Sequence, residues 1–240
     1  MNHSELFIDA HCHLGKNPNR KTLVIAVINS GKSREWEAIY RFCSNHSDVI
    51  PGFGIHPWET AFSNDQTVQK LEKKIRDWIY QKPDRTPCVI GEIGLHRSPQ
   101  QTSLAKQQSL FEAQLILAQK YLLVPSIHCV KAWEPLKEAL SKYPPPKGLL
   151  MHDYSGSIEF LKTLLPFGTF VSFSEKSFTR NPQKKISLIK KIPPNRYLLE
   201  SDQEYPSNLQ ALYQKVASLI NISKEELVQQ MKTNFSNLFK

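Results

Sequence analysis

The 240-residue chain has no apolar run that approaches the roughly 18–20 residues of a membrane-spanning helix. Its opening segment, MNHSELFIDAHCHLG, lacks the basic stretch, apolar core and small-residue cleavage site of a signal peptide. We therefore expect a cytoplasmic protein with no membrane partner. Apolar residues make up 40% of the chain and charged residues 22%, a balance typical of globular rather than disordered proteins.

Cysteine is scarce, with four residues in all, and no two of them form a CxxC pair. Their spacing matches no disulfide framework. Cys12 and Cys129 each stand beside a histidine, so either thiol could bind zinc. We favour the alternative that both are small buried residues, the more common setting of a free cysteine.

Low-complexity linkers and obvious repeats are absent. A chain of 240 residues is long enough to bury the core of one large α/β domain. We expect residues 1–240 to form a single domain. Nothing in the sequence indicates an obligate protein partner, and we expect a monomer.

Acidic residues are the minority, because 31 lysines and arginines face 22 aspartates and glutamates, a net charge of +9. A basic surplus favours an anionic partner, nucleic acid above all, although many basic proteins bind none. The densest basic stretches, 70–76 and 184–191, carry apolar residues at helical spacing. We interpret both as exposed faces of helices.

Short apolar runs alternate with amphipathic stretches along the whole chain. The runs, at 6–13, 23–29, 49–56, 88–96, 123–130, 148–154, 169–174 and 197–202, are typical of parallel strands covered on both faces. Helical patterns lie at 34–44, 68–80, 104–120, 133–143, 158–165, 183–191 and 209–220. A capping box at Ser223 begins a last helix that reaches residue 239.

This alternation predicts an α/β fold of the TIM (β/α)8 barrel type. The connection between residues 14 and 22 is too short for a helix, which would distort the barrel slightly. A doubly wound open sheet is the alternative.

Residues that commonly bind metals fall within or at the ends of the predicted strands. They are His11, His13, His56, Glu92, His128, His152 and Asp202. Because active-site side chains of such barrels gather at the C-terminal ends of the strands, these residues should converge. His11 and His13 are two residues apart and therefore point to one face, where Asp9 could support them.

The chemistry of this set suits divalent metal ions. His128 or His152 alone would more often be a core histidine with satisfied hydrogen bonds. Glu92 and Asp202 are more informative, because a carboxylate is costly to bury unless it is paired or bound to metal. Histidines with carboxylates favour Zn²⁺, Mn²⁺ or Mg²⁺, and the set is large enough for one or two ions bridged by Glu92. Asp202 could orient a metal-activated water and accept its proton.

Six sequence blocks resemble, in order, those of the TatD family of metal-dependent deoxyribonucleases, which are amidohydrolase-like TIM barrels. FIDAHCHLG resembles the D-x-H-x-H-L segment, GFGIHPWE the G-x-H-P block and VIGEIGL the G-E-x-G-L block. LLVPSIHC resembles the P-x-x-x-H strand, MHDYSG the H-x-F-S-G block and LLESD the L-E-T-D block. The blocks cover nearly the whole chain, which is therefore identified as a divergent member of this family.

The resemblance implies hydrolysis of DNA phosphodiester bonds by a metal-activated water, with Asp202 and Glu92 as catalytic residues. The implied ligands of one or two Zn, Mn or Mg ions are His11, His13, Glu92, His128, His152 and Asp202. The expected substrate contacts are His56, His96 and Lys131. For His56, packing beside Pro57 and Trp58 is the alternative role.

The residues around these ligands depart from the family pattern. His96 stands where Asp usually follows GEIGL, and Val130 and Lys131 stand where an arginine is usual. Gln203 and Glu204 replace the Ala-Pro that usually follows the strand-eight aspartate. Because this rim would select the substrate, two alternatives remain open. One is a metal-dependent hydrolase of a small amide, ester or lactone, and the other is a non-enzymatic scaffold that retains the barrel.

Overall fold

The computed structural model describes residues 6–16, 18, 24–81, 87–98, 103–180 and 182–240. In this part of the chain one parallel sheet carries nine strands. They are β1 (Phe7–Leu14), β2 (Val24–Asn29), β3 (Val49–Phe53), β4 (Val89–His96), β5 (Val124–Val130), β6 (Leu149–Met151), β7 (Thr169–Phe173), β8 (Tyr197–Leu199) and β9 (Glu204–Tyr205).

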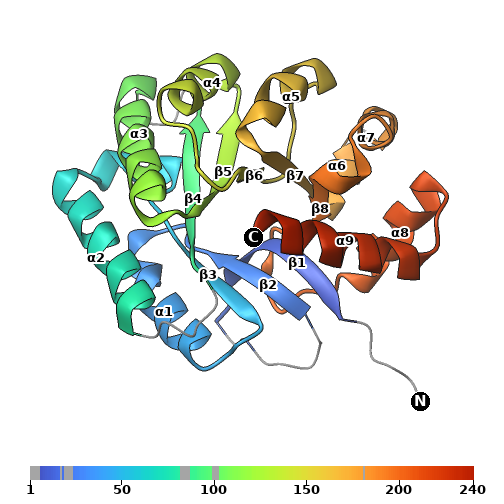
Figure 1. Ribbon diagram of the computed structural model, residues 1–240, viewed down its shortest axis with the longest axis horizontal. Coiled ribbons are helices and arrows are strands. Elements are labelled where there is room, and N and C mark those ends of the chain that lie inside the picture. The colour runs from blue at the N-terminus through green and yellow to red at the C-terminus, as the bar shows by residue number, and fades with distance from the viewer. Residues whose placement is uncertain (1–5, 17, 19–23, 82–86, 99–102, 181) are drawn as a thin grey trace.

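The order of the strands identifies the way the sheet is wound. Strands β1 to β8 follow one another across the sheet in chain order, and β9 pairs with the outer side of β1. A doubly wound sheet would reverse its order partway across, so that alternative is wrong. The predicted barrel-type winding is confirmed, and Figure 1 shows the strands curling inside a ring of helices.

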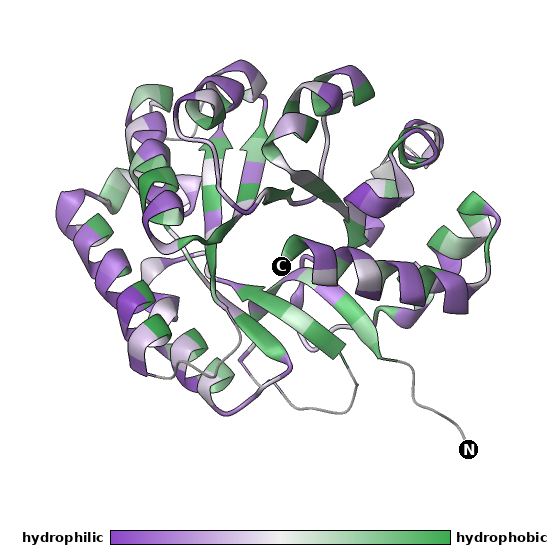
Figure 2. Cartoon of the chain, viewed as in Figure 1, coloured by the Kyte–Doolittle hydropathy of each residue, from purple (hydrophilic) through white to green (hydrophobic). Residues whose placement is uncertain are grey.

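The helices lie outside the sheet (Figure 1). Hydrophobic and hydrophilic residues alternate along them (Figure 2), and most of their buried residues are apolar. They are α1 (Trp36–Ser44), α2 (Asp65–Gln81), α3 (Leu104–Tyr121), α4 (Trp133–Lys142), α5 (Ile158–Leu164), α6 (Glu175–Arg180), α7 (Pro182–Ile189), α8 (Gln210–Ile220) and α9 (Lys224–Leu238). None of the described helices has both the length and the apolarity that a membrane span requires.

The sequence patterns found most of these helices, within a few residues at each end. The capping box before α9 is present, because the Ser223 hydroxyl accepts from the Glu226 N–H and the Glu226 carboxylate accepts from the Ser223 N–H. Helix α6 was not predicted, since its sequence EKSFTR is too short to show a helical period. The described residues between β1 and β2 form no helix, as expected, although residues 17 and 19–23 lie outside the described part.

The distortion of the barrel lies between β8 and β1, where no ladder of paired residues forms in the described part of the chain. The segment after β8 joins the two edges instead. The Asp202 N–H donates to the His11 carbonyl at 3.0 Å, and the His13 N–H donates to the Gln203 carbonyl at 2.9 Å. These bonds hold Asp202 beside the two histidines of β1.

Buried side-chain hydrogen bonds reinforce this seam. Asp9 is fully buried, and its carboxylate accepts from the Ser201 N–H at 2.8 Å, the Ser201 hydroxyl at 2.7 Å and the Ser207 hydroxyl at 2.9 Å. The Tyr213 hydroxyl of α8 donates to the Ile8 carbonyl at 2.8 Å. We expected Asp9 to support the histidine pair, and the structure instead places its carboxylate on the loop that carries Asp202.

Candidate metal centre

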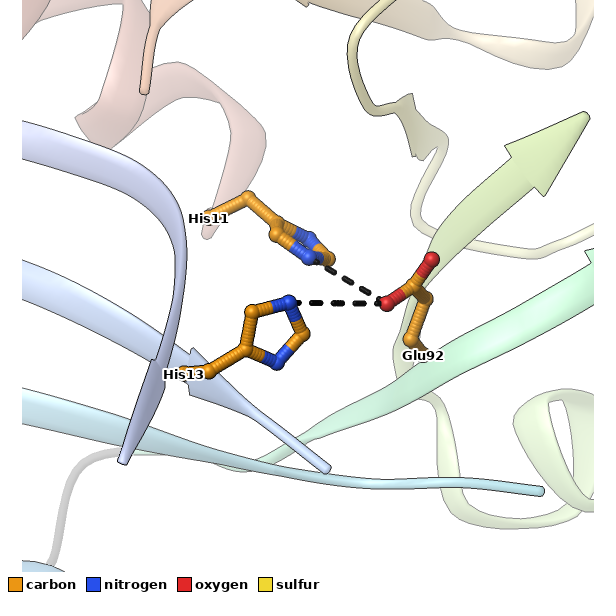
Figure 3. A group of neighbouring side chains, drawn as sticks. All are labelled: His11, His13 and Glu92. Atoms are coloured by element: carbon orange, nitrogen blue, oxygen red, sulfur yellow. Dashed lines mark ion pairs between the residues drawn. The ribbon is translucent and has the colours of Figure 1, made fainter. Parts of the chain in front are cut away.

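Five histidines surround the carboxylate of Glu92 at the C-terminal edge of the sheet. The Glu92 Oε2 atom lies 3.4 Å from His11 Nε2 and 3.9 Å from His13 Nε2 (Figure 3). The Oε1 atom lies 3.1 Å from His128 Nδ1, 2.8 Å from His152 Nε2 and 3.1 Å from His56 Nε2. Each carboxylate oxygen therefore faces two of the predicted histidine ligands, with His56 as a third neighbour of Oε1, an arrangement suited to a carboxylate between two cations.

Asp202 completes the group from the end of β8. Its Oδ1 atom lies 3.5 Å from His13 Nε2, and its Oδ2 atom accepts from the Lys176 ammonium at 3.1 Å. Candidate ligand atoms of Asp202, His11 and His152 lie within 4.8 Å of one another. The structure thus brings together all six residues that the sequence predicted as metal ligands.

Irregularities in two strands aim His11 and Glu92 at this centre. The register of β1 shifts between Asp9 and Cys12, and that of β4 shifts between Ile90 and Ile93. Extra residues in a bulge leave the regular pairing and redirect their side chains. His11 and Glu92 are both in these shifted stretches, so the bulges help to set their positions.

Hydrogen bonds on the outer side of His13 and His152 fix which ring nitrogen carries the proton. His13 Nδ1 lies 3.1 Å from the Asn29 backbone carbonyl, and His152 Nδ1 lies 3.4 Å from Glu200 Oε1. The Asn29 carbonyl is an acceptor, and Glu200 Oε1 is one too because it also accepts from the Asp153 N–H, so each Nδ1 carries the hydrogen. The lone pair of each Nε2 therefore faces the centre, as metal binding requires.

His11 provides the clearest test of whether a metal ion fits. Its Nδ1 atom lies 3.0 Å from the Ser126 hydroxyl, which can accept a hydrogen there, and 3.1 Å from the side-chain amide of Asn29. Its Nε2 atom is buried and makes no hydrogen bond with any described residue. A buried nitrogen without a hydrogen bond is costly unless another group uses its lone pair. The donor set therefore fits a divalent cation.

His56 has the opposite proton arrangement. Its Nδ1 atom accepts from the Trp58 N–H at 3.1 Å, so the hydrogen is on Nε2, which lies 3.1 Å from Glu92 Oε1. In this arrangement His56 is a hydrogen-bond donor rather than a metal ligand. We expected it near the mouth of the site, and the structure places it deeper, with only 4% of its surface exposed.

His96 lies against the outer side of His128 rather than in the cavity. Its Nδ1 atom is 2.9 Å from His128 Nε2 and also accepts from the Trp58 indole N–H at 3.3 Å. Because this nitrogen is an acceptor, His128 carries its hydrogen on Nε2 and presents the Nδ1 lone pair to Glu92. The predicted substrate contact of His96 stays a prediction, but its observed neighbour is a candidate ligand.

Glu200 is a residue that the sequence analysis did not single out. It is fully buried, and its carboxylate accepts from the Asp153 N–H at 3.0 Å and from the Ser172 hydroxyl while facing His152. Burial raises the pKa of Glu200 to about 7. The signal was present, because Glu200 is a carboxylate inside an apolar run, the same feature that identified Glu92.

Burial and neighbouring charges set the protonation states at the centre. Burial lowers the pKa of His11 and of His128 to about 4, so both imidazoles are neutral at neutral pH. Burial alone would raise the pKa of Asp202, but the His13 hydrogen bond and nearby positive charges hold it well below its usual range. Burial alone would lower the pKa of His13 and of His152, but the carboxylates beside them raise both, that of His152 well above its usual value. These two imidazoles must therefore be neutral when a metal binds, because neutral imidazoles and ionised carboxylates are the forms that bind metal.

The cluster of predicted ligands around Glu92 faces a cavity of about 540 Å³. Lys32, Trp58 and Lys176 line it together with five of the six predicted ligands, while His11 lies beneath them. Val130 also lines the cavity, but Lys131 lines an adjoining cleft. Of the two cysteines considered as ligands, Cys12 is buried and its thiol donates to the Val27 carbonyl.

Comparison with known proteins agrees with this geometry. A family model described as TatD related DNase matches residues 8–240. The uncharacterized Escherichia coli metal-dependent hydrolase YjjV is 23% identical over 97% of each chain. The uncharacterized Saccharomyces cerevisiae deoxyribonuclease YMR262W is 24% identical over 87% of this chain and 86% of the yeast protein. The human 3′-5′ RNA nuclease TATDN2 is 26% identical over 84% of this chain, but over 29% of the human protein.

The fold is also that of a solved relative. The crystal structure of Escherichia coli YjjV, a TatD homolog, superposes with a TM-score of 0.81 over 97% of each chain, at 20% sequence identity. At that identity the likeness establishes the fold alone. The family model covers nearly the whole chain, so the chain belongs to the TatD-related DNase family.

Proposed function

We propose that this TatD-family metal-dependent hydrolase is a nuclease that cleaves phosphodiester bonds of DNA. The observation that carries the proposal is the Glu92 carboxylate, whose two oxygens each face a separate pair of the predicted histidine ligands. Two-cation sites of this kind are common in enzymes that hydrolyse phosphate esters. The yeast and human relatives named above are a deoxyribonuclease and an RNA nuclease.

The proposed ligands divide into two sets. His11, His13 and Asp202 would hold one ion, His128 and His152 the other, and Glu92 would lie between them. Bound ions of this type lower the pKa of a coordinated water, which makes hydroxide available near neutral pH.

Other polar side chains of the cavity would accept the proton of the attacking water and bind the substrate. Asp202 is ionised, and its side chain is 21% exposed to the cavity, so it can orient the attacking water and accept its proton. The ammonium groups of Lys32 and Lys176, which line the cavity, can donate to phosphate oxygens. The net charge of +9 favours the same anionic substrate.

Labelled oligonucleotides test this function directly. DNA and RNA strands that carry a fluorophore at the 3′ or the 5′ end are incubated with the protein and Mn²⁺, Mg²⁺ or Zn²⁺. We expect DNA to be degraded, and degradation to stop when EDTA is added. Intact nucleic acid together with cleavage of small esters or lactones would show that the substrate is a small molecule. A protein that binds no divalent ion would support the scaffold alternative.

His96→Phe is expected to weaken metal binding at the His128 side by about 10-fold, because loss of a partner behind a metal-bound histidine typically costs 10–100-fold in affinity. Phenylalanine keeps an aromatic ring beside His128 but offers its Nε2–H no acceptor. Isothermal titration of the metal-free protein with Zn²⁺ measures the change. His96→Asp is the matched control, since a carboxylate restores the acceptor. Equal affinities in the Phe variant and the wild type would contradict the assigned role.

A further inference from the structure

A second cleft of about 480 Å³ adjoins the catalytic cavity. The loops after β4 and β5, the start of α4 and the loop before α5 line it. Ser155 lines both this side cleft and the catalytic cavity, so the two are neighbours. A chain-like substrate could therefore occupy both at once.

Two cationic side chains line the side cleft. Arg97 and Lys131 are exposed, and neither forms an ion pair with a described residue. The Arg97 N–H donates to the Val130 carbonyl at 2.9 Å, so the two loops run side by side. Glu134 is the one carboxylate among the cleft's lining residues, which leaves a surplus of positive charge.

The beginning of α4 adds donors of another kind. Its N-cap residue is Ala132, which provides no side-chain hydrogen bond to the first turn of this ten-residue helix. Pro135 has no N–H, so the donors of this turn are the N–H groups of Trp133 and Glu134, and such groups at a helix start favour an anion. Trp133 packs against Tyr154 and Phe160, with ring centroids 5.4 Å from each, and gives the cleft an apolar wall. A phosphate with its attached sugar or base matches this combination.

The cations of these loops lie outside the catalytic cavity. Val130 lines that cavity, whereas Lys131 and Arg97 line the side cleft. We propose that the side cleft binds a phosphodiester group adjacent to the one that is cleaved. The proposal rests on the proposed nuclease function. A protein with such a cleft should prefer nucleic-acid chains to esters with a single phosphate.

Binding in the absence of metal separates this proposal from catalysis. Fluorescence anisotropy of a labelled DNA oligonucleotide is measured in EDTA over a series of salt concentrations for wild type and Arg97→Ala/Lys131→Ala. Each lost phosphate contact should reduce the slope of log K against log salt by about 1. Arg76→Ala/Lys190→Ala removes the same charge from exposed sites on α2 and after α7, and should keep the wild-type slope. Equal slopes in all three proteins would overturn the proposal.

Hydrolysis gives the second readout. Thymidine 5′-(p-nitrophenyl phosphate) has one phosphodiester, whereas an oligonucleotide has several. The double variant at Arg97 and Lys131 should lower the ratio of kcat/KM for oligonucleotide to kcat/KM for the single diester by about 10-fold. An equal loss on both substrates would place the two cations at the catalytic centre and overturn the proposal. If wild type cleaves neither substrate, the nuclease function fails, and the anisotropy slopes still decide whether the cleft binds phosphate.

Discussion

Asp202→Asn is expected to slow phosphodiester hydrolysis by about 10²–10⁴-fold, the usual contribution of a general base. The asparagine amide cannot accept the proton of the attacking water. It is also neutral, so it binds a metal cation more weakly than the carboxylate does. Asparagine keeps the shape of aspartate and tolerates the left-handed backbone found at residue 202, where φ is 49°. The backbone bond from residue 202 to the His11 carbonyl also stays, so the fold should be intact.

Steady-state kinetics with labelled DNA at saturating Mn²⁺ measure this loss, and circular dichroism checks the fold. Glu204→Gln is the matched control, because it removes one carboxylate from the same segment at an exposed position that does not line the cavity. The control should retain wild-type activity. Wild-type hydrolysis by Asp202→Asn would rule out the proposed role of this carboxylate.

The sequence could predict that the candidate metal ligands lie close together, because their closeness depends on two regular features of the fold. Parallel strands end at one edge, so His11 and Asp202 meet although they are far apart in the chain. Side chains two residues apart on a strand share a face, so His11 and His13 both reach Glu92. Neither inference needs the exact pairing of the strands.

Other features of the site depend on contacts that no local pattern contains. The bulges around His11 and Glu92 arise from the register of neighbouring strands. The proton positions on His56 and His128 depend on the Trp58 backbone and on His96, which only the folded chain brings near. The sequence therefore predicted the set of candidate residues but not which histidines present a lone pair to the centre.

The side cleft illustrates the same limit for substrate recognition. Lys131 was expected to contact the substrate on the basis of its place after His128. The structure keeps Lys131 next to Arg97 and away from the catalytic cavity, because the loops after β4 and β5 run together. Loop geometry, rather than strand order, sets which phosphate such a cation can reach.

Asp9→Ala is expected to reduce the free energy of unfolding by about 3–5 kcal/mol, because it removes three buried hydrogen bonds to a carboxylate and leaves the Ser201 N–H without a partner. These bonds connect β1 to the loop after β8, where the sheet has no ladder of its own. The loop carries Asp202, so the variant should also bind metal more weakly than wild type.

Asp9→Asn should lose less, since its amide oxygen can still accept from the Ser201 N–H and the serine hydroxyls can turn to accept from its NH₂ group. Urea unfolding at pH 8, above the Asp9 pKa that burial raises to about 6, compares the three proteins with the carboxylate ionised. A stability of Asp9→Ala within 1 kcal/mol of wild type, on the order of a single hydrogen bond, would contradict the expectation. The seam would then be held by the backbone bonds of His11 and His13 and by the Tyr213 bond to the Ile8 carbonyl, and Asp9 would have no part in positioning Asp202.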